Sequence, residues 1–562
     1  MEFKNEDTFG IGEALLESSF SKALDEVTSG FSNHNPMRIG GANILSDKEV
    51  KVVSPIDRRV VIGYFQLGRA EHALKAIQEA KAAFKKGKEN GGWRDYSWTD
   101  RVAILERAAS VLSRKKFHVA AILSYENGKS RDESIGEVDE AIDFLRYYCY
   151  LIRKNEGLII SRTPYKAGKE YAVNEKNEGE RFGHQGARSS GERVSIVSKP
   201  FGVWSVIAPF NFPVSLSVGM IAAALITGNT VVFKPSFGDN PAPLTGLQIY
   251  DVFEEAGLPE GVLNYITGLG GEIGDILVEN PEVSGIAFTG SREVAMHIQE
   301  KVRGNTGRQQ NPNQVKLPKQ FVAEMGSKNP VIVTGSADID RAVQGVISAA
   351  FGFCGQKCSA ASRAIVHASI YDRFIEAAVA KTRTLRIGDP LRKDIDIGPL
   401  IGKSALDRYL VSVDEAKQRG KVICGGHRLE GTDLYDNGCY VEPAIIEVPE
   451  GDPLFRSELF MPVLAVLRYN EFDEAIRIAN STEYGLTAGL YSGDGKEIAY
   501  FNDNIEFGTI YVNRNVSATT GAVVGQQTFV GWKGSSLSCK GTSSLSYLLQ
   551  FVREQSQTIV DM

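Results

Sequence analysis

Apolar residues that recur every three or four positions predict three amphipathic helices in the first part of the chain, over residues 69–86, 99–127 and 137–155. Thr99-Asp100 is an N-terminal cap signal for the second of them. Residues 157–199 instead alternate short apolar runs with glycine and charge. This pattern predicts a protruding β-hairpin or a flexible arm outside the core.

From residue 200 the pattern changes to short apolar runs separated by helical stretches. The runs predicted to be buried strands are 203–208, 230–234, 262–266 and 283–290. Strands that alternate with helices predict a parallel sheet covered by helices on both faces. Such sheets bind ligands at the carboxyl ends of their strands.

The rest of the chain repeats this style of organisation without an internal repeat of fixed period. A polar segment with several Asn, Gln and Pro residues, 304–319, predicts a surface loop. A second α/β series then extends to residue 512, with helices expected near 338–351 and 371–385. The tail, "YLLQFVREQSQTIV", is typical of a helix followed by an exposed strand. The predicted fold class is α/β.

Composition narrows the class of protein. A hydrophobic fraction of 43% and a charged fraction of 23% over 562 residues are typical of a soluble globular protein with several structural units. The net charge of −6 argues against nucleic acid binding, because there is no basic excess to neutralise phosphates. We expect no membrane span and no signal peptide. Six cysteines in a chain of this length predict a reducing, cytoplasmic setting.

Cys354 and Cys358 are two cysteines separated by three residues in "FGFCGQKCSAASRAIV". A zinc site would need further closely spaced Cys or His ligands, and the seven histidines are scattered. A redox pair usually has two intervening residues. Cys354 is best interpreted as a small buried residue. Cys358 follows a Gly-Gln-Lys turn, so local sequence leaves open whether it is a nucleophile or a packing residue.

Two strand-to-helix turns contain glycines that could approach a phosphate. "IAFTGSREVA" and "NYITGLGGEIG" can each direct backbone N–H groups and a helix N-terminus at an anion, although each could also be a simple turn. Lys234 ends one predicted strand, as a ligand donor or a solvated strand end. Glu324 ends another, as a functional carboxylate or a capping or salt-bridged one.

Taken together, these motifs resemble the aldehyde dehydrogenase superfamily over nearly the whole chain. The similar stretches, in the order of the family, are "APFNFPVSL", "TGNTVVFKPS", "GLPEGVLNYITG", "FTGSREV", "VAEMGSKNPVIV", "GQKCSAASR" and "SELFMPVLAV". The separation of 34 residues between Glu324 and Cys358 is also that of the family. "FGFCGQKCSAASRAIV" and "TTGAVVGQQTFVGWKG" are most similar to the branch that oxidises glutamate semialdehyde to glutamate.

The resemblance implies a role for three residues in the chemistry. Cys358 would be the nucleophile that forms a thiohemiacetal with the aldehyde. The Asn211 side chain would join the backbone N–H of Cys358 in an oxyanion hole. Glu324 would be the general base that activates water to hydrolyse the resulting thioester. No metal is expected.

The resemblance also implies a cofactor site and a substrate site. The expected cofactor is NAD, with NADP possible because Phe237 stands where the family often has a glutamate. The residues expected at the cofactor are Lys234, Ser236, Gly290, Ser291, Glu458 and Phe460. The residues expected at the substrate are Ser359, Gly521, Ala522, Phe529 and Glu140, of which the first three would anchor its carboxylate.

The chain departs from the family pattern at Met461, Thr528, Val530 and Ser536, which stand where the family has Gly or Pro. These changes leave other interpretations open: a dehydrogenase of another semialdehyde or of an aliphatic aldehyde, a cofactor-free hydrolase, or a non-catalytic binding protein on the same scaffold. A Rossmann-type cofactor domain is expected over residues 1–156 and 200–321. A catalytic domain is expected over 322–530, and an oligomerisation arm and tail over 157–199 and 531–562. An exposed strand in the arm predicts a homo-oligomer, dimeric or dimer-based.

Overall fold

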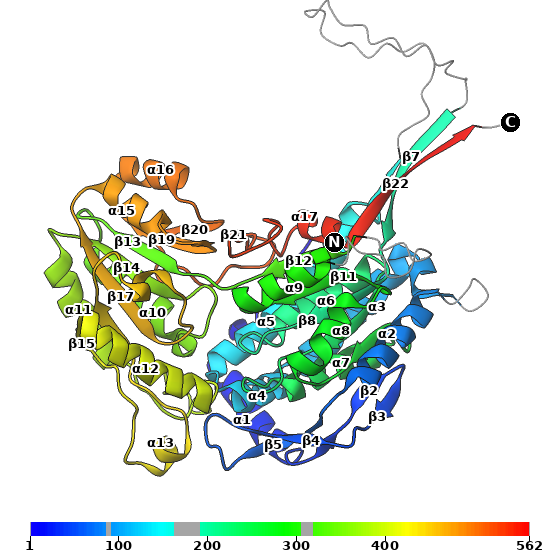
Figure 1. The fold of residues 1–562 in the computed structure, drawn as a ribbon, viewed down its shortest axis with the longest axis horizontal. Helices are drawn as coiled ribbons and strands as arrows, with labels where there is room; N and C mark the ends of the chain where they lie inside the picture. Colours follow the sequence, from blue (N-terminus) through cyan, green and yellow to red (C-terminus); the bar gives the residue numbers. More distant parts are fainter. Residues whose placement is uncertain (1, 86–90, 162–191, 305–317, 561–562) are drawn as a thin grey trace, which may run out of the picture.

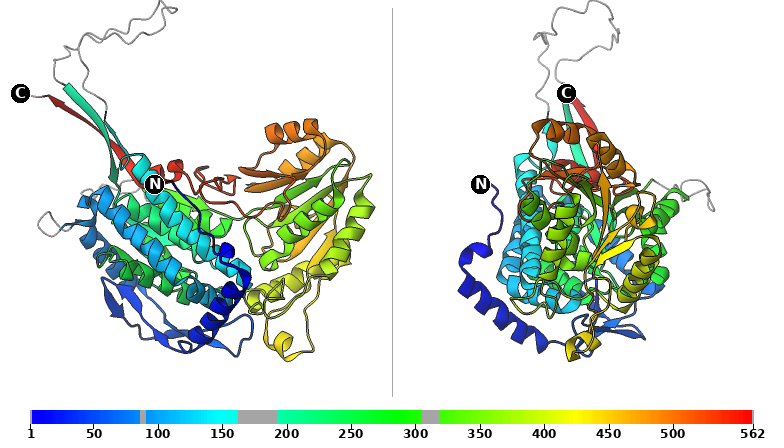
Figure 2. Two further views of the ribbon diagram at one scale, coloured as in Figure 1. Left: turned by 180° about the vertical axis from the view of Figure 1, so that it is seen from behind. Right: turned by 90° about the vertical axis from the view of Figure 1, so that its left-hand side faces the viewer.

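The computed structural model describes residues 2–85, 91–161, 192–304 and 318–560. Two α/β units lie side by side, and a narrow β arm projects from the first of them (Figures 1 and 2). Each unit contains a seven-stranded sheet with helices packed on it. Among the described residues, no helix is long and apolar enough to cross a membrane.

The first sheet contains all four strands predicted between residues 200 and 290. Its strands, in order across the sheet, are β12 (Gln320–Glu324), β11 (Val283–Thr289), β8 (Val203–Ile207), β9 (Thr230–Lys234), β10 (Leu263–Tyr265), β2 (Met37–Ile39) and β3 (Ala42–Ile44). The five strands from β12 to β10 are parallel, whereas β2 and β3 are antiparallel additions. The parallel sheet expected from the alternation of strands and helices is therefore confirmed.

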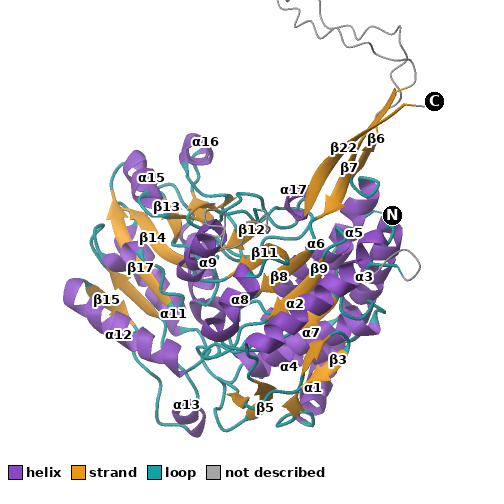
Figure 3. Ribbon diagram, turned by 45° about the vertical axis from the view of Figure 1, so that its right-hand side comes forward, coloured by secondary structure: helices purple, strands orange, loops and turns teal. Residues whose placement is uncertain are grey.

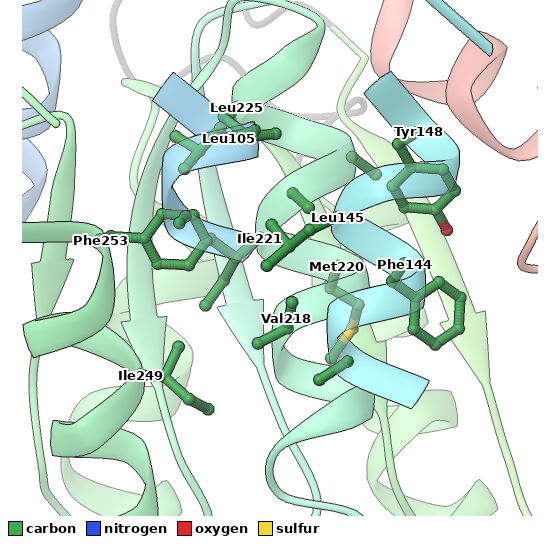
Figure 4. Packing of buried hydrophobic residues seen from close by; sticks show 14 of the residues in the cluster. Leu105, Phe144, Leu145, Tyr148, Val218, Met220, Ile221, Leu225, Ile249 and Phe253 are labelled. Carbon is green, nitrogen blue, oxygen red and sulfur yellow. The ribbon is translucent and has the colours of Figure 1, made fainter. Parts of the chain in front are cut away.

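Helices cover both faces of the first sheet, which is why its strands are apolar on both sides. In β9, Val231 and Phe233 face one hydrophobic cluster and Val232 faces the other. The first cluster, part of which Figure 4 shows, is formed with α3 (Trp98–Arg114), α4 (Lys116–Asn127), α5 (Arg131–Lys154), α6 (Ser215–Ile226) and α7 (Pro243–Glu255). The second is formed with α2 (Ala70–Lys85), α8 (Asp275–Glu279) and α9 (Arg292–Gly304).

The predicted helices differ from the observed ones in two places. The segment 99–127 is two helices, α3 and α4, because Lys115 leaves the helical conformation with φ −93° and ψ 6°. Apolar spacing continues across the break because both helices bury a face in the same unit. The caps also differ. Ser97 caps α3 by accepting a hydrogen bond from the Asp100 N–H, and α5 begins at Arg131 after the Ser130 cap, six residues before the predicted start.

Several N-terminal elements have no counterpart in the prediction. The helix α1 (Glu13–Thr28) buries only Phe20, Ala23 and Val27, so its apolar pattern is sparse. A small sheet follows, formed by β1 (His34–Asn35), β5 (Val61–Gln66) and β4 (Glu49–Val53). Short strands of this kind carry little periodicity to recognise.

The second unit is built around another buried sheet, shown as orange strands in Figure 3. Its strands, in order, are β15 (Lys421–Cys424), β16 (Ala444–Glu447), β17 (Val463–Tyr469), β14 (Ala361–His367), β13 (Asn329–Val333), β19 (Thr487–Tyr491) and β20 (Thr509–Val512). Its longer helices are α10 (Ile339–Phe351), α11 (Tyr371–Arg383), α12 (Lys403–Arg419), α15 (Phe472–Asn480) and α16 (Gly495–Asn504). The helices expected near 338–351 and 371–385 are α10 and α11.

The arm is a three-stranded antiparallel sheet of β22 (Val552–Val560), β7 (Glu192–Pro200) and β6 (Ile159–Ser161). The exposed strand expected in the tail is thus the outer strand of the arm, preceded by the short helix α17 (Leu545–Leu548). The middle of the predicted arm, residues 162–191, lies outside the described residues. The expected loop at 304–319 lies outside them for the most part, since residues 305–317 are not described.

The expected boundary between residues 321 and 322 falls inside β12. This strand pairs with β11 from Gln320 to Glu324, so the first sheet continues through Glu324. Residues just beyond 530 also belong to the body of the molecule, because the Leu537 N–H donates a hydrogen bond to the Ala323 carbonyl. The tail therefore contributes to the centre of the molecule before it enters the arm.

Candidate active site

A strained turn after α10 carries Cys358. Phe353 and Cys354 have left-handed φ values of 49° and 54°, and Gly355 follows with φ 66°. A Cβ on Gly355 would lie 2.5 Å from the Met461 carbonyl oxygen, so only glycine fits there. The turn leaves Cys354 fully buried, whereas Cys358 is partly exposed. Strain of this kind in an ordered turn is typical of functional sites.

The Cys358 thiol is protonated in this arrangement. Its surroundings raise its pKa to about 12, first because of burial and then because of the negative charges of Glu458, Glu324 and Glu140. Burial also raises the pKa of the Cys354 thiol. A thiolate is the nucleophilic form of cysteine, so any covalent chemistry at Cys358 needs a base or a nearby positive charge to favour ionisation.

Glu324, the last residue of β12, lines the same pocket as Cys358. Its Oε1 accepts a hydrogen bond of 2.9 Å from the Ser536 hydroxyl. Its Oε2 is buried and, among the described residues, has no hydrogen-bond partner. Burial raises the pKa of Glu324 to about 8, which places its titration in the range useful to a general base.

The pocket is mainly apolar. Its lining residues are Phe144, Leu216, Gly219, Met220, Thr289, Glu324, Met325, Cys358, Leu486, Phe529, Thr542 and Tyr547. Phe144 on α5 and Met220 on α6 lie close together at one side of the hydrophobic cluster of Figure 4. The pocket draws on both α/β units and gives the thiol and the carboxyl group mainly apolar surroundings.

Asn211 lies beside the turn that carries Cys358. Its side-chain amide donates a hydrogen bond of 3.1 Å to the Gln356 carbonyl. Gln356 is held in turn by the Ile401 N–H, which donates to its side-chain oxygen. The amide of Asn211 is therefore tied to the backbone two residues before Cys358, with a second N–H available for another acceptor.

A buried ion pair stabilises the segment that carries Asn211. Lys129 Nζ contacts Glu137, and the two side chains are 1% and 0% exposed. The ammonium lies 3.6 Å from the centre of the Phe212 ring, directly after Asn211. Glu137 accepts a hydrogen bond of 2.7 Å from the Val214 N–H. The pair thus joins α5 to the segment that carries Asn211.

Removing one partner of this pair should destabilise the protein strongly. Lys129→Met leaves the Glu137 carboxylate buried without its cation, so we expect a loss of about 3–5 kcal/mol in the free energy of unfolding. The measurement is chemical denaturation at pH 7. Lys22→Met is the matched control, because the Lys22–Glu26 pair is 78% and 54% exposed; its expected effect is within about 0.5 kcal/mol. Equal losses in the two variants would contradict the structural role.

Four of the residues expected at the cofactor lie at two places in the first unit. Lys234 is the last residue of β9 and Ser236 follows the strand, whereas Gly290 and Ser291 connect β11 to α9. The Lys234 ammonium is buried, which lowers its pKa to about 8, and it donates a hydrogen bond to the Pro235 carbonyl. The Ser291 hydroxyl accepts a bond from the Val294 N–H at the start of α9. A helix N-terminus and a lysine at the carboxyl ends of parallel strands are suited to binding a dinucleotide.

Glu458 and Phe460 come from the second unit. Glu458 accepts a hydrogen bond of 2.7 Å from the Ser327 N–H, and burial raises its pKa to about 7. A Cβ on Gly326 would lie 1.9 Å from Glu458 Oε2, so a side chain at this position would displace the Glu458 carboxyl group. Phe460 has φ 61° and packs edge-on against Phe210, with ring centres 5.8 Å apart. Glu458 thus contacts the segment that follows β12, and Phe460 contacts the segment that follows β8.

Two departures from the family pattern are absorbed by packing. The side chain of Met461 is buried in the core of the second unit, so its bulk goes into that core. Phe237 packs against the cluster that includes Phe65 and Leu244. Its ring therefore supplies no carboxylate for a ribose.

The residues expected at the substrate lie around Cys358 on several elements. The Ser359 carbonyl accepts a hydrogen bond of 2.6 Å from the Thr519 hydroxyl, which ties the loop carrying Gly521 and Ala522 to the nucleophile turn. Gly521 has φ 80°, and its carbonyl accepts a bond of 2.7 Å from Arg514. Within the described part of the chain, the N–H groups of Gly521 and Ala522 make no hydrogen bond.

The other two expected substrate residues differ in how they approach the site. Phe529 lines the pocket directly. Glu140 on α5 is outside the pocket lining but close enough to raise the pKa of Cys358 by its charge. Burial raises the pKa of Glu140 itself to about 7.

Sequence reasoning missed Arg514, Met220, Tyr547 and the role of Ser536. Arg514, Met220 and Tyr547 carry no recognisable motif, and long-range packing alone brings them to the site. Ser536 had a signal, because it stands where a glycine was expected.

Comparisons with known proteins identify the family of the chain. The chain matches the model of the aldehyde dehydrogenase family over residues 44–556 and belongs to this family. It is similar to 1-pyrroline-5-carboxylate dehydrogenase of Bacillus mycoides, with 35% identity over 540 residues, covering 96% of this chain and 95% of the relative. The protein of the same name from Bacillus subtilis is 36% identical over 530 residues, covering 94% and 93%.

Solved structures show the same likeness. A point mutant of Thermus thermophilus 1-pyrroline-5-carboxylate dehydrogenase superposes with a TM-score of 0.87 at 33% identity, covering 100% of this chain and 99% of that one. A structure of the Thermus enzyme with bound NAD has a TM-score of 0.86, also at 33% identity and with coverage of 100% and 99%. The α/β fold of the family is thus confirmed for this chain.

Proposed function

We propose that this protein is an NAD-dependent aldehyde dehydrogenase that oxidises L-glutamate 5-semialdehyde, formed from 1-pyrroline-5-carboxylate, to L-glutamate in proline degradation. The observation that carries the proposal is one pocket lined by Cys358 and by the general-base candidate Glu324. The relatives named above support the substrate, and the Thermus structure with NAD supports the cofactor.

The proposed reaction begins at Cys358. The thiol loses its proton to solvent, and the thiolate adds to the aldehyde carbon to form a thiohemiacetal in the pocket that Glu324 also lines. The amide of Asn211 and the backbone N–H of Cys358 stabilise the negative oxygen that develops. NAD, when bound, accepts the hydride that leaves this carbon. A thioester on Cys358 remains.

Hydrolysis of the thioester completes the proposed reaction. Glu324, in its ionised form, takes a proton from a water molecule as the water attacks the thioester carbonyl, and this proton then goes to the sulfur of Cys358. The C–S bond breaks, Cys358 regains its proton, and the carboxylic acid product ionises and leaves. In this mechanism Lys234, Ser236, Gly290 and Ser291 hold the adenosine and phosphate part of the cofactor. Glu458 and Phe460 position its nicotinamide end.

The substrate carboxylate is proposed to bind at Ser359 and at the N–H groups of Gly521 and Ala522. The guanidinium of Arg514, bonded to the Gly521 carbonyl, orients this loop and adds positive charge near the anion. Glu140 is proposed to face the substrate ammonium, which would favour the ionised form of its carboxyl group. Phe529 packs against the aliphatic chain.

A substrate panel tests the proposal. We expect 1-pyrroline-5-carboxylate to have the highest kcat/KM among itself, succinate semialdehyde, propanal and benzaldehyde, measured as NADH or NADPH formation at 340 nm. Gly521→Ala places a Cβ at φ 80° and should raise KM for the first substrate by on the order of tenfold while leaving propanal unaffected. Equal turnover of propanal by the unmodified enzyme would refute the substrate assignment, and no reduction of either cofactor would refute the activity.

The arm supports a further part of the proposal, a homo-oligomer that is dimeric or built from dimers. Strand β22 is the outer strand of the arm sheet and pairs only with β7 among the described strands. An unpaired edge of nine residues is suited to pairing with a second copy of the chain. The six cysteines are all free, which agrees with the proposed cytoplasmic setting.

A further inference from the structure

The tail of the chain adds a short segment to the free edge of β12, opposite Glu324. The Met325 N–H donates a hydrogen bond of 2.9 Å to the Ser535 carbonyl, and the Leu537 N–H donates one of 3.1 Å to the Ala323 carbonyl. These two bonds flank Glu324 and Ser536, which form an antiparallel bridge. Residues opposed in this way are a non-hydrogen-bonded pair, whose side chains lie closest together and on the same face.

The hydrogen bonds of Ser536 determine where its single proton points. Its Oγ accepts bonds of 3.3 Å from the N–H groups of Ser538 and Cys539. The same oxygen lies 2.9 Å from Glu324 Oε1. Because two amides occupy its lone pairs, the hydroxyl proton is the group that faces Glu324. Ser536 is 3% exposed, so bulk water does not compete for this proton.

The two oxygens of Glu324 are thereby made unequal. Oε1 always accepts from Ser536, whether the carboxyl group is ionised or protonated. Oε2 is buried in the pocket lining and, among the described residues, lacks a partner. A proton taken up by Glu324 therefore resides on Oε2.

We propose that Ser536 is a positioning residue that holds the general base Glu324 by one oxygen, favours its ionised form and leaves the other oxygen to activate the hydrolytic water. This inference rests on the role of Glu324 in the proposed function. The family pattern has a glycine at position 536, which has no hydroxyl to donate. A hydrogen bond donated to a carboxylate lowers its pKa, opposing the effect of burial at Glu324.

Cys358 and Tyr547 remain neutral where Glu324 titrates. Cys358 and Tyr547 are the groups whose pKa values respond to its charge, and burial raises both, that of Cys358 to about 12 and that of Tyr547 well above its usual range. Glu458 and Glu140, whose pKa values burial raises to about 7, titrate at a lower pH than Glu324. The loss of the pH dependence of thioester hydrolysis in Glu324→Gln is therefore the observation that assigns it to Glu324.

The test is the decay of the propanoyl thioester formed from propanal and NAD, because this aldehyde cannot cyclise as pH changes. Samples are acid-quenched across pH 6–10 and the acyl-enzyme is quantified by intact-protein mass spectrometry. We expect the hydrolysis rate of the unmodified enzyme to rise through a midpoint near pH 8. Ser536→Ala should move the midpoint upward by about one pH unit and slow hydrolysis about tenfold at pH 7.

Two further variants separate positioning from general damage. Ser536→Thr keeps the hydroxyl and should return the midpoint toward its original value. Ser538→Ala removes a neighbouring hydroxyl that accepts only from the Lys540 N–H, and should leave the midpoint unchanged. An unchanged midpoint in Ser536→Ala, with Ser536→Thr folded and active, would overturn the inference. The same holds if Ser536→Thr and Ser536→Ala shift equally.

Failure of the underlying function gives a different result. Glu324→Gln should abolish the pH-dependent hydrolysis altogether. If it does so while Ser536→Ala leaves the midpoint unchanged, only the role of Ser536 is wrong. If Glu324→Gln retains the rate and its pH dependence, Glu324 is not the base and both proposals are wrong.

Discussion

Cys358→Ala should lose NADH formation from every aldehyde by at least about 10⁴-fold, because no thiohemiacetal can form without the nucleophile. The side chain is partly exposed at the end of a strained turn, so the truncation removes few packing contacts and the fold should persist. The measurement is steady-state NADH formation at high enzyme concentration, with circular dichroism and NAD binding by calorimetry as checks of integrity.

Cys354→Ala is the matched control for this experiment. It truncates a thiol only four positions away, but one that is fully buried in the core of the second unit. We expect a modest loss of stability, about 1 kcal/mol, and retention of turnover. Turnover that survives in Cys358→Ala, or disappears in Cys354→Ala with the fold intact, would show that the nucleophile is assigned wrongly.

Glu324→Gln should separate the two halves of the reaction. Hydride transfer does not need the carboxylate once the thiolate has formed, whereas thioester hydrolysis loses its general base. We expect a burst of one NADH per active site followed by a steady rate lower by about 10²–10⁴-fold. The glutamine keeps the acceptor that faces Ser536, so the local structure is preserved. Stopped-flow absorbance and mass spectrometry of the trapped thioester measure the two phases.

The raised pKa of Glu324 determines how the rate of hydrolysis by the unmodified enzyme changes with pH. With the pKa of Glu324 raised to about 8, the ionised base is the minor form at neutral pH and becomes the major form above it. Hydrolysis should therefore increase with pH through that value, and the increase should disappear in Glu324→Gln. Glu458→Gln is the contrasting variant, because its expected effect is a higher KM for NAD with no accumulation of thioester. A burst in Glu458→Gln but not in Glu324→Gln would exchange the two roles.

Much of the molecule could be predicted from local patterns. The strands β8, β9, β10 and β11 were recognisable because each is buried on both faces and is therefore a continuous apolar run. Cys358 and Glu324 were recognisable because each belongs to a short local motif. Cys358 follows a Gly-Gln-Lys turn, and Glu324 ends an apolar strand. Both residues line one pocket because the fold brings the end of β12 close to the turn after α10.

The sequence by itself therefore determined the fold class, the central parallel sheet and the two residues on which the proposed chemistry depends. Tertiary structure alone decided how the base is held. Ser536 meets Glu324 across a separation of 212 residues, and the tail strand β22 completes the arm with β7. The Lys129–Glu137 pair likewise appears only when α5 packs beneath the Asn211 segment. Such contacts leave no periodicity in the chain, because they depend on which surfaces meet after the helices and strands have formed.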